Sequence, residues 1–142
     1  MNDTIKAVLW DFGGVITSSP FEAFNKFETE QQIPVDFIRR INAENHETNA
    51  WAKLESSEIN LDEFDELFRS ETSAKGHEIS GKEVINLLSG EIRPDMVRVL
   101  KKIKKNFLVG CITNNVNAGR GPGMARSKKK QDALLLLIPH LM

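Results

Sequence analysis

The side chains in this sequence that are suited to chemistry follow two short apolar runs. Residues 5–10 (IKAVLW) lead into Asp11, and after Phe12 come two glycines, Gly13 and Gly14. An aspartate in such a position can attack phosphorus and form an aspartyl-phosphate. Glycines leave the backbone N–H groups open to the close approach of an anion, as phosphate-binding turns require. We therefore interpret Asp11 as a candidate nucleophile, with Gly13 and Gly14 making room for its substrate.

The second apolar run, residues 107–113 (FLVGCIT), ends at Thr113. Both runs are typical of strands that are buried on both faces of a parallel sheet. Ligands of open parallel sheets bind at the carboxyl ends of the strands. If the two strands are neighbours, the carboxylate of Asp11 and the hydroxyl of Thr113 face the same crevice. A divalent cation would screen the carboxylate from the phosphate, and Mg²⁺ prefers such oxygen ligands.

A purely structural interpretation of the first segment is also open. An Asp-Phe-Gly-Gly turn can simply end a strand, with Asp11 capping the segment that follows. The triplet DFG also occurs in the magnesium motif of protein kinases, but here neither a glycine-rich loop nor a catalytic loop precedes it. Spacing alone favours the plain turn over the nucleophile.

The residues between the two apolar runs have helical spacing. Pro20 stands where a helix would begin, a position that proline favours. Pro34 is predicted to open a second helix that has Val35, Ile38 and Ile41 on one side. These segments therefore predict helices rather than further strands.

Two more helices carry capping signals, and a third precedes the second apolar run. Asn60 is followed three residues later by Glu63, and Ser80 by Glu83, which is the pattern of a capping box. Residues 93–105 (RPDMVRVLKKIKK) place apolar residues on one side and lysines in the last turn, where the helix dipole favours them. This helix and the strand after it can return parallel to the first strand through a right-handed crossover.

This order of elements predicts an α/β fold with a parallel sheet and a helical insertion. We divide the chain into the first strand and nucleophile loop (1–19), a helical cap (20–91), a core helix with the second strand and its loop (92–127), and an atypical tail (128–142). A sheet of only two parallel strands is too small to stand alone. We therefore expect the α/β domain to be incomplete at its carboxyl end.

Composition narrows the class of protein further. The 142 residues are 40% hydrophobic and 27% charged, which fits one soluble globular domain or a small core with an insertion. A net charge of −1 gives no basis for binding nucleic acid or an anionic membrane. Cys111 is the single cysteine, which favours a reducing compartment. With no recognisable signal peptide and no apolar run near the roughly 20 residues that span a bilayer, we expect a cytoplasmic protein.

The motif KAVLWDFGGVI, a helical insertion, and then RPDMVRVLKKIKKNFLVGCITNN together resemble the haloacid dehalogenase (HAD) superfamily. The resemblance covers residues 5–127 and is greatest to the phosphatase-like branch that includes the amino-terminal domains of soluble epoxide hydrolase and acyl-CoA dehydrogenase family member 10. It implies a Rossmann-like parallel sheet with a helical cap. It also implies a Mg²⁺-dependent phosphatase that acts on a small phosphorylated metabolite.

The resemblance assigns roles to four positions of the two motifs and leaves one role unfilled. It implies that Asp11 is the nucleophile and a Mg²⁺ ligand, and that Thr113 and Asn114 bind the phosphoryl oxygens. Gly13 stands where the family often has a second aspartate, the general acid/base. The backbone carbonyl of Gly13 keeps the metal contact, but the side-chain acid is lost. Gly14 is expected to help bind the substrate.

The later motifs of the family have no counterpart. The family places a lysine and then an acidic pair after further strands, whereas the lysines at 128–130 come too early and Asp132 has no acidic neighbour. We therefore expect a truncated chain, shortened by a frameshift near SKKKQDALLLL, with weak or absent turnover. Missing core strands would leave apolar surface exposed, which invites self-association.

Two other functions stay open. A dehalogenase would use Asp11 to attack carbon and would need no metal. A non-catalytic fragment would act only by binding a partner. Among residues with weaker claims, Cys111 is expected to be a core residue, His46 and His77 are expected at the surface, and Trp51 is at least as well explained by packing as by substrate selection.

Overall fold

The computed structural model describes residues 5–112 and 132–133, and these residues divide into two compact units. The first unit contains residues 5–19, 90–112 and 132–133, and the second contains residues 20–89. Within the described residues, no helix is both long enough and apolar enough to cross a membrane.

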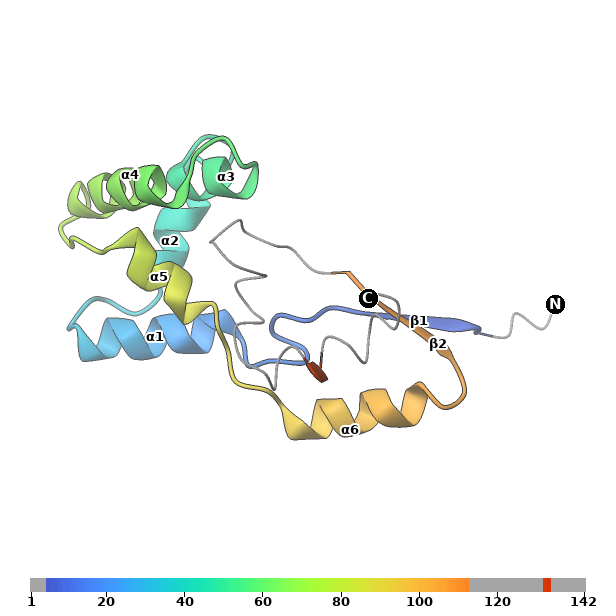
Figure 1. Ribbon diagram of the computed structural model, residues 1–142. Helices are drawn as coiled ribbons and strands as arrows, with labels where there is room; N and C mark the ends of the chain where they lie inside the picture. Colours follow the sequence, from blue (N-terminus) through green and yellow to red (C-terminus); the bar gives the residue numbers. More distant parts are fainter. Residues whose placement is uncertain (1–4, 113–131, 134–142) are drawn as a thin grey trace. The chain divides into compact units, whose positions relative to one another are not determined.

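The first unit is built on a parallel pair of strands, β1 (Ala7–Trp10) and β2 (Leu108–Cys111). Helix α6 (Pro94–Ile103) leads into β2, as the sequence predicts, and begins with proline in its first turn (Figure 1). One face of this strand pair packs with α6 and with the loop after β1, where Phe12, Ile16 and Leu100 are buried. The parallel α/β arrangement predicted from the two apolar runs is therefore confirmed.

The opposite face of the strand pair differs from the prediction. The side chains of Leu9 and Leu108 are exposed, so the expectation that both strands are buried on both faces is wrong for the described chain. A parallel strand becomes buried on both faces only when segments cover both sides. The described residues supply such a cover, in α6 and the loop after β1, on one side only.

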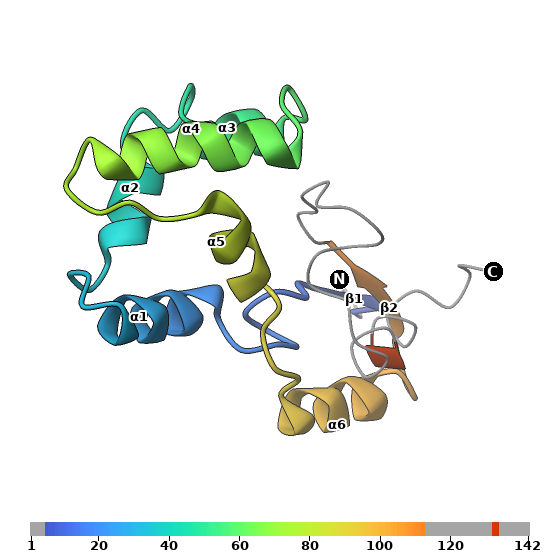
Figure 2. The same cartoon turned by 60° about the vertical axis from the view of Figure 1, so that its left-hand side comes forward.

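The second unit contains five helices, α1 (Pro20–Glu30), α2 (Phe37–Ala43), α3 (Ala50–Glu55), α4 (Leu61–Ser73) and α5 (Gly81–Leu87). Helix α4 contacts α2, α3 and α5 (Figure 2). The helices share one apolar core, in which Phe24, Ile38, Phe64 and Phe68 are fully or almost fully buried. The unit therefore has a hydrophobic core of its own.

Several helix boundaries agree with the capping signals in the sequence. Helix α1 begins at Pro20. Helix α4 is preceded by a complete capping box: the Asn60 side chain accepts from the Glu63 amide, and the Glu63 carboxylate accepts from the Asn60 amide. Ser80 caps α5 by accepting from the Glu83 amide. These boundaries are set locally, because the cap and its partner are three residues apart.

Helix α2 begins three residues later than Pro34, where the sequence predicted its start. Asp36 precedes the helix with a left-handed backbone (φ 64°) and so interrupts any helix that opens at Pro34. The amides of Asp36 and Ile38 donate to the buried carboxylate of Glu28, at 2.7 and 2.8 Å. Val35 consequently lies outside the helix and is exposed.

Candidate active site

The carboxyl ends of β1 and β2 lie side by side. Trp10 pairs with Cys111 in the parallel register, and the Ile112 amide donates to the Trp10 carbonyl at 2.8 Å. Asp11 therefore leaves the sheet beside Ile112. Thr113 and Asn114, the other two predicted site residues with side chains, lie outside the described residues. Their approach to Asp11 stays a prediction.

The Asp11 side chain is exposed at this edge of the sheet. Its Oδ1 accepts from the Phe12 amide at 2.7 Å. No residue that the structure describes bonds to its Oδ2, so one carboxylate oxygen is available to a substrate. Burial raises the pKa of the Cys111 thiol, and the charge of Asp11 raises that pKa further. The pairing of Trp10 with Cys111 places Asp11 next to the end of β2.

The loop after Asp11 is anchored by its apolar residues. Phe12 and Ile16 are buried, and the Phe12 carbonyl accepts from the amides of Ile16 and Thr17 at 3.0 and 3.1 Å. Gly14 has φ 77°, a left-handed conformation that glycine adopts without a steric cost. Its position therefore explains why the turn needs a glycine there.

The two predicted phosphate-binding amides have different surroundings. The Gly14 amide donates to the buried Thr17 hydroxyl at 3.2 Å, so it is already engaged. The Gly13 amide has no hydrogen-bond partner among the described residues. Of the two glycines, Gly13 offers the free donor.

A cation that the sequence reasoning did not select lies beside this loop. Arg93 is the residue before α6; its amide donates to the Ile16 carbonyl at 2.8 Å, and its Nη1 donates weakly to the Gly14 carbonyl at 3.4 Å. Reciprocal bonds between Ser18 and Glu91 hold the same segment to the loop, at 2.7 and 2.9 Å. The Arg-Pro pair at the helix start was visible in the sequence, but only the folded chain brings this arginine to the Asp11 loop.

Comparison with known proteins finds resemblance at the level of structure only. No family model matches the sequence, and no curated protein matches it. The structure of the HAD hydrolase YfnB from Bacillus subtilis, solved with bound magnesium, matches 96% of this chain with a TM-score of 0.52 and 18% sequence identity. This chain spans 62% of the length of that one. The chain has a HAD-like fold.

A second HAD family structure, BT-2542 from Bacteroides thetaiotaomicron in complex with magnesium and inorganic phosphate, is 20% identical. It matches 80% of this chain and 55% of its own, with a TM-score of 0.46, which is too low to add to the fold assignment. The HAD-like fold predicted from the two motifs is thus supported by YfnB. The branch of the superfamily is not resolved by either comparison.

The described part of this HAD-like chain provides few ligands for the magnesium ion that its fold implies. No group of three or more His, Cys, Asp or Glu side chains converges within residues 5–112 and 132–133. Mg²⁺ can be held by one or two carboxylates when water and substrate phosphate complete its six oxygen ligands. Asp11, with one oxygen unengaged, fits one place in that minimal set, and the Gly13 carbonyl stays a predicted second ligand.

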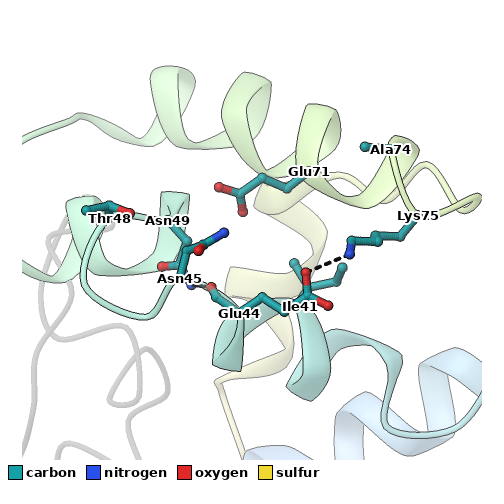
Figure 3. A pocket seen from close by; sticks show the side chains of 8 residues that line it. All are labelled: Ile41, Glu44, Asn45, Thr48, Asn49, Glu71, Ala74 and Lys75. Atoms are coloured by element: carbon teal, nitrogen blue, oxygen red, sulfur yellow. Dashed lines mark hydrogen bonds and ion pairs between the residues drawn. The ribbon is translucent and has the colours of Figure 1, made fainter.

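A pocket of about 250 Å³ lies in the helical unit (Figure 3). It is lined by Ile41, Glu44, Asn45, Thr48, Asn49, Glu71, Ala74 and Lys75. Its polar groups are mostly engaged in the fold: Lys75 pairs with Glu44 at 2.7 Å, Glu71 accepts from the Ala50 amide at 2.8 Å, and Asn49 caps α3. Because ligand pockets usually measure about 300–1,000 Å³, this pocket is the weaker candidate site.

The aromatic and histidine residues of the helical unit do not line this pocket. Trp51 packs edge-on against Phe64, with ring centroids 5.8 Å apart, and its indole donates to Glu55. His77 packs edge-on against Phe37, at 5.1 Å. His46 is exposed. The packing interpretation of Trp51 is thereby supported over substrate selection.

Proposed function

We propose that this chain is a Mg²⁺-dependent phosphatase that acts on a small phosphorylated metabolite through an aspartyl-phosphate at Asp11. The observation that carries the proposal is the paired strand end: the Ile112 amide bonds to the Trp10 carbonyl, and the Asp11 carboxylate stands exposed beside it with one oxygen unengaged. The resemblance to the phosphatase-like branch of the HAD superfamily supports the choice of phosphorus over carbon as the site of attack.

In the proposed reaction, a carboxylate oxygen of Asp11 attacks phosphorus and the bond from phosphorus to the leaving oxygen breaks. Water then attacks the aspartyl-phosphate, which releases inorganic phosphate and restores the carboxylate. Bound Mg²⁺ would neutralise charge on the phosphoryl oxygens, held by Asp11 and the Gly13 carbonyl. The Gly13 amide supplies a hydrogen-bond donor to the same oxygens, and we propose that Thr113 and Asn114 supply others.

The absence of a side chain at Gly13 has a consequence for substrate class. With no acid at that position, the leaving oxygen must depart as an anion or take its proton from water. We therefore propose that the enzyme favours phosphate esters of acidic alcohols, such as aryl phosphates, over alkyl phosphates. The helical unit (20–89) would act as the cap that selects among them, and we place the protein in the cytoplasm.

The test is a phosphatase assay with p-nitrophenyl phosphate and Mg²⁺, comparing wild type with Asp11→Asn. Asp95→Asn is the matched control, because Asp95 is an exposed aspartate of the same unit whose side chain pairs, among the described residues, with Arg98. We expect Asp11→Asn to lower kcat by at least about 100-fold, Asp95→Asn to have no effect, and a chelator to abolish turnover. Mass spectrometry should detect a phosphoryl adduct on the peptide that contains Asp11.

Two rival functions give different results in that test. Equal rates for wild type and Asp11→Asn would eliminate the nucleophile. Chelator-resistant release of halide from a 2-haloacid, without phosphatase activity, would indicate a dehalogenase. No turnover of either substrate would indicate a non-catalytic binding protein, a function consistent with the small set of metal ligands in the described chain.

A further inference from the structure

The open face of the β1–β2 pair carries large aliphatic side chains. Along each strand, alternate residues point to opposite faces. Trp10 belongs to the buried core cluster of the first unit, and Val8, Val109 and Cys111 are partly buried and pack against that cluster, so the residues between them form the other face. That open face consists of Ile5, Ala7 and Leu9 on the first strand and its extension, and Leu108, Gly110 and Ile112 on the second.

The aliphatic side chains of this face are highly exposed, and they adjoin one another. Leu108 is 74% exposed, Ile5 71%, Leu9 66% and Ile112 64%. The Leu9 side chain lies over Gly110, since a Cβ added to Gly110 would come within 2.9 Å of Leu9 Cδ2. The two strands therefore present one contiguous patch, which we call the open sheet face, rather than four separate residues.

The size of the open sheet face is sufficient for an interaction surface. Four exposed aliphatic side chains expose on the order of 500 Å², close to the largest patches found on monomeric proteins. Two such faces in contact would bury about 1,000 Å², which is the lower limit for a specific protein interface. Each leucine or isoleucine that becomes fully buried contributes about 1.5–3 kcal/mol.

The chemistry of the face makes a second copy of the chain its best partner. All six residues of the open sheet face are uncharged, so the same face can meet itself without placing like charges together. A two-fold axis requires that kind of self-complementarity, because each residue meets the same surface of its partner. We infer that two copies of this chain associate through their open sheet faces, forming a two-layer packing of their strand pairs.

This inference is independent of the proposed phosphatase activity, because Asp11 lies at the end of the strands and not among the six face residues. The dimer would also satisfy the requirement that parallel strands be covered on both sides. The cover on one side is α6 with the loop after β1, and the cover on the other is the partner's strand pair.

The test measures the mass of the wild-type chain by sedimentation velocity over a range of concentrations, together with two single variants of the face, Leu9→Lys and Leu108→Lys. Val35→Lys is the matched control, since Val35 is a 55% exposed aliphatic residue of the helical unit. We expect a wild-type dimer, a dissociation constant raised by roughly 10- to 100-fold or more in either face variant, and no change in the control. Circular dichroism melts establish that each variant is folded.

The outcomes separate the possible occupants of the face. A folded wild-type monomer at all concentrations, with a cooperative melt and no binding of a hydrophobic dye, would overturn the inference and indicate that the chain covers its own face. Open-ended aggregates instead of a dimer would also overturn it. If one face variant fails to fold, the other decides: an undiminished dimer in a folded variant contradicts the role of the open sheet face.

Discussion

The Ile112 amide and the Trp10 carbonyl are joined by a hydrogen bond of 2.8 Å, although the two residues stand near opposite ends of the described chain. This bond continues the parallel register of β1 and β2 past Cys111. It places Ile112 beside Trp10, so the segment that begins at Asp11 leaves the sheet next to Ile112. The proposed hydrolase site at this edge depends on that pairing as well as on the Asp11 carboxylate.

Replacing Arg93 is expected to weaken substrate binding with little effect on turnover. Its guanidinium lies at the Asp11 loop, with Nη1 3.4 Å from the Gly14 carbonyl oxygen, and can attract a phosphate there. Under the proposed function, Arg93→Gln should raise KM for p-nitrophenyl phosphate by about 10-fold, which corresponds to one charge-assisted hydrogen bond, with little change in kcat. Arg98→Gln, at an exposed arginine within α6, is the control. Unchanged KM and unchanged inhibition by inorganic phosphate in Arg93→Gln would contradict this role.

Adding a side chain at Gly90 is expected to destabilise the first unit by a steric clash. A Cβ at this position would lie 2.7 Å from the Ser18 carbonyl oxygen and 2.9 Å from its hydroxyl oxygen. The first of these atoms is backbone, in a residue whose amide and hydroxyl both bond to Glu91, so it cannot easily move. We expect Gly90→Ala to lower the free energy of unfolding by about 1–3 kcal/mol, measured by urea denaturation. Ser73→Ala, at an exposed helical position, should leave stability unchanged. An equally small effect of Gly90→Ala would show that the backbone around Ser18 moves to accommodate the added methyl group.

Removing the Glu28 carboxylate is expected to destabilise the helical unit strongly. Its side chain is fully buried, and its two oxygens accept from the amides of Asp36 and Ile38 at the start of α2. Glu28→Ala leaves both amides without an acceptor and should cost about 2–4 kcal/mol in urea denaturation. Glu28→Gln, which keeps one acceptor oxygen, should have a stability between those of the wild type and Glu28→Ala. Glu30→Ala is the control because Glu30 is exposed and pairs only loosely with Lys26, at 3.8 Å. Equal stability of the Glu28 and Glu30 variants would rule out the cap.

Asp65 predicts a dependence of stability on acid pH. Burial raises its pKa, but hydrogen bonds from the Ser80 hydroxyl, the Lys82 amide and the Arg69 guanidinium outweigh burial and lower the pKa to about 2. Because the folded pKa is below the unfolded value of 3.8, the stabilisation is complete above pH 4 and is lost as the pH falls from about 4 to about 2.

The size of this effect is about 1 kcal/mol. The full pKa shift corresponds to about 2 kcal/mol, but the Arg69 partner is 42% exposed and solvent screens that part of the interaction. Thermal melts at pH 2 to 5 should show that Asp65→Asn flattens the decline over this range. Asp62→Asn should keep it, since the Asp62 side chain is 82% exposed. A decline of the same steepness in wild type and Asp65→Asn would refute the assignment.

Some features of the fold could be predicted because their causes are local in the sequence. Pro20 starts α1, and Asn60 with Glu63 caps α4, since each signal acts over one helical turn. Helix α3 and the true start of α2 could not be predicted in the same way. The left-handed Asp36 and its acceptor Glu28 are eight residues apart and meet only when α1 and α2 fold together.

The candidate site was predicted only in part, for a similar reason. Asp11 directly follows the last residue of β1, as the sequence indicated, but its function stays a prediction, as do the roles of Thr113 and Asn114. Arg93 was missed because its position beside Gly14 comes from the pairing of residues 17 and 92, which an antiparallel bridge joins. No periodicity in the sequence reports a contact of that kind.

By itself, the sequence determined the two strands, most of the helices and the polar residue that follows β1, because short apolar runs, caps and prolines act on their neighbours. Only the tertiary structure decided which faces of those strands are buried. The sequence of an apolar strand is the same whether one or both of its faces are buried. The segments that bury those faces are distant in the sequence. For β1 and β2 that difference separates a buried sheet from one with an open sheet face.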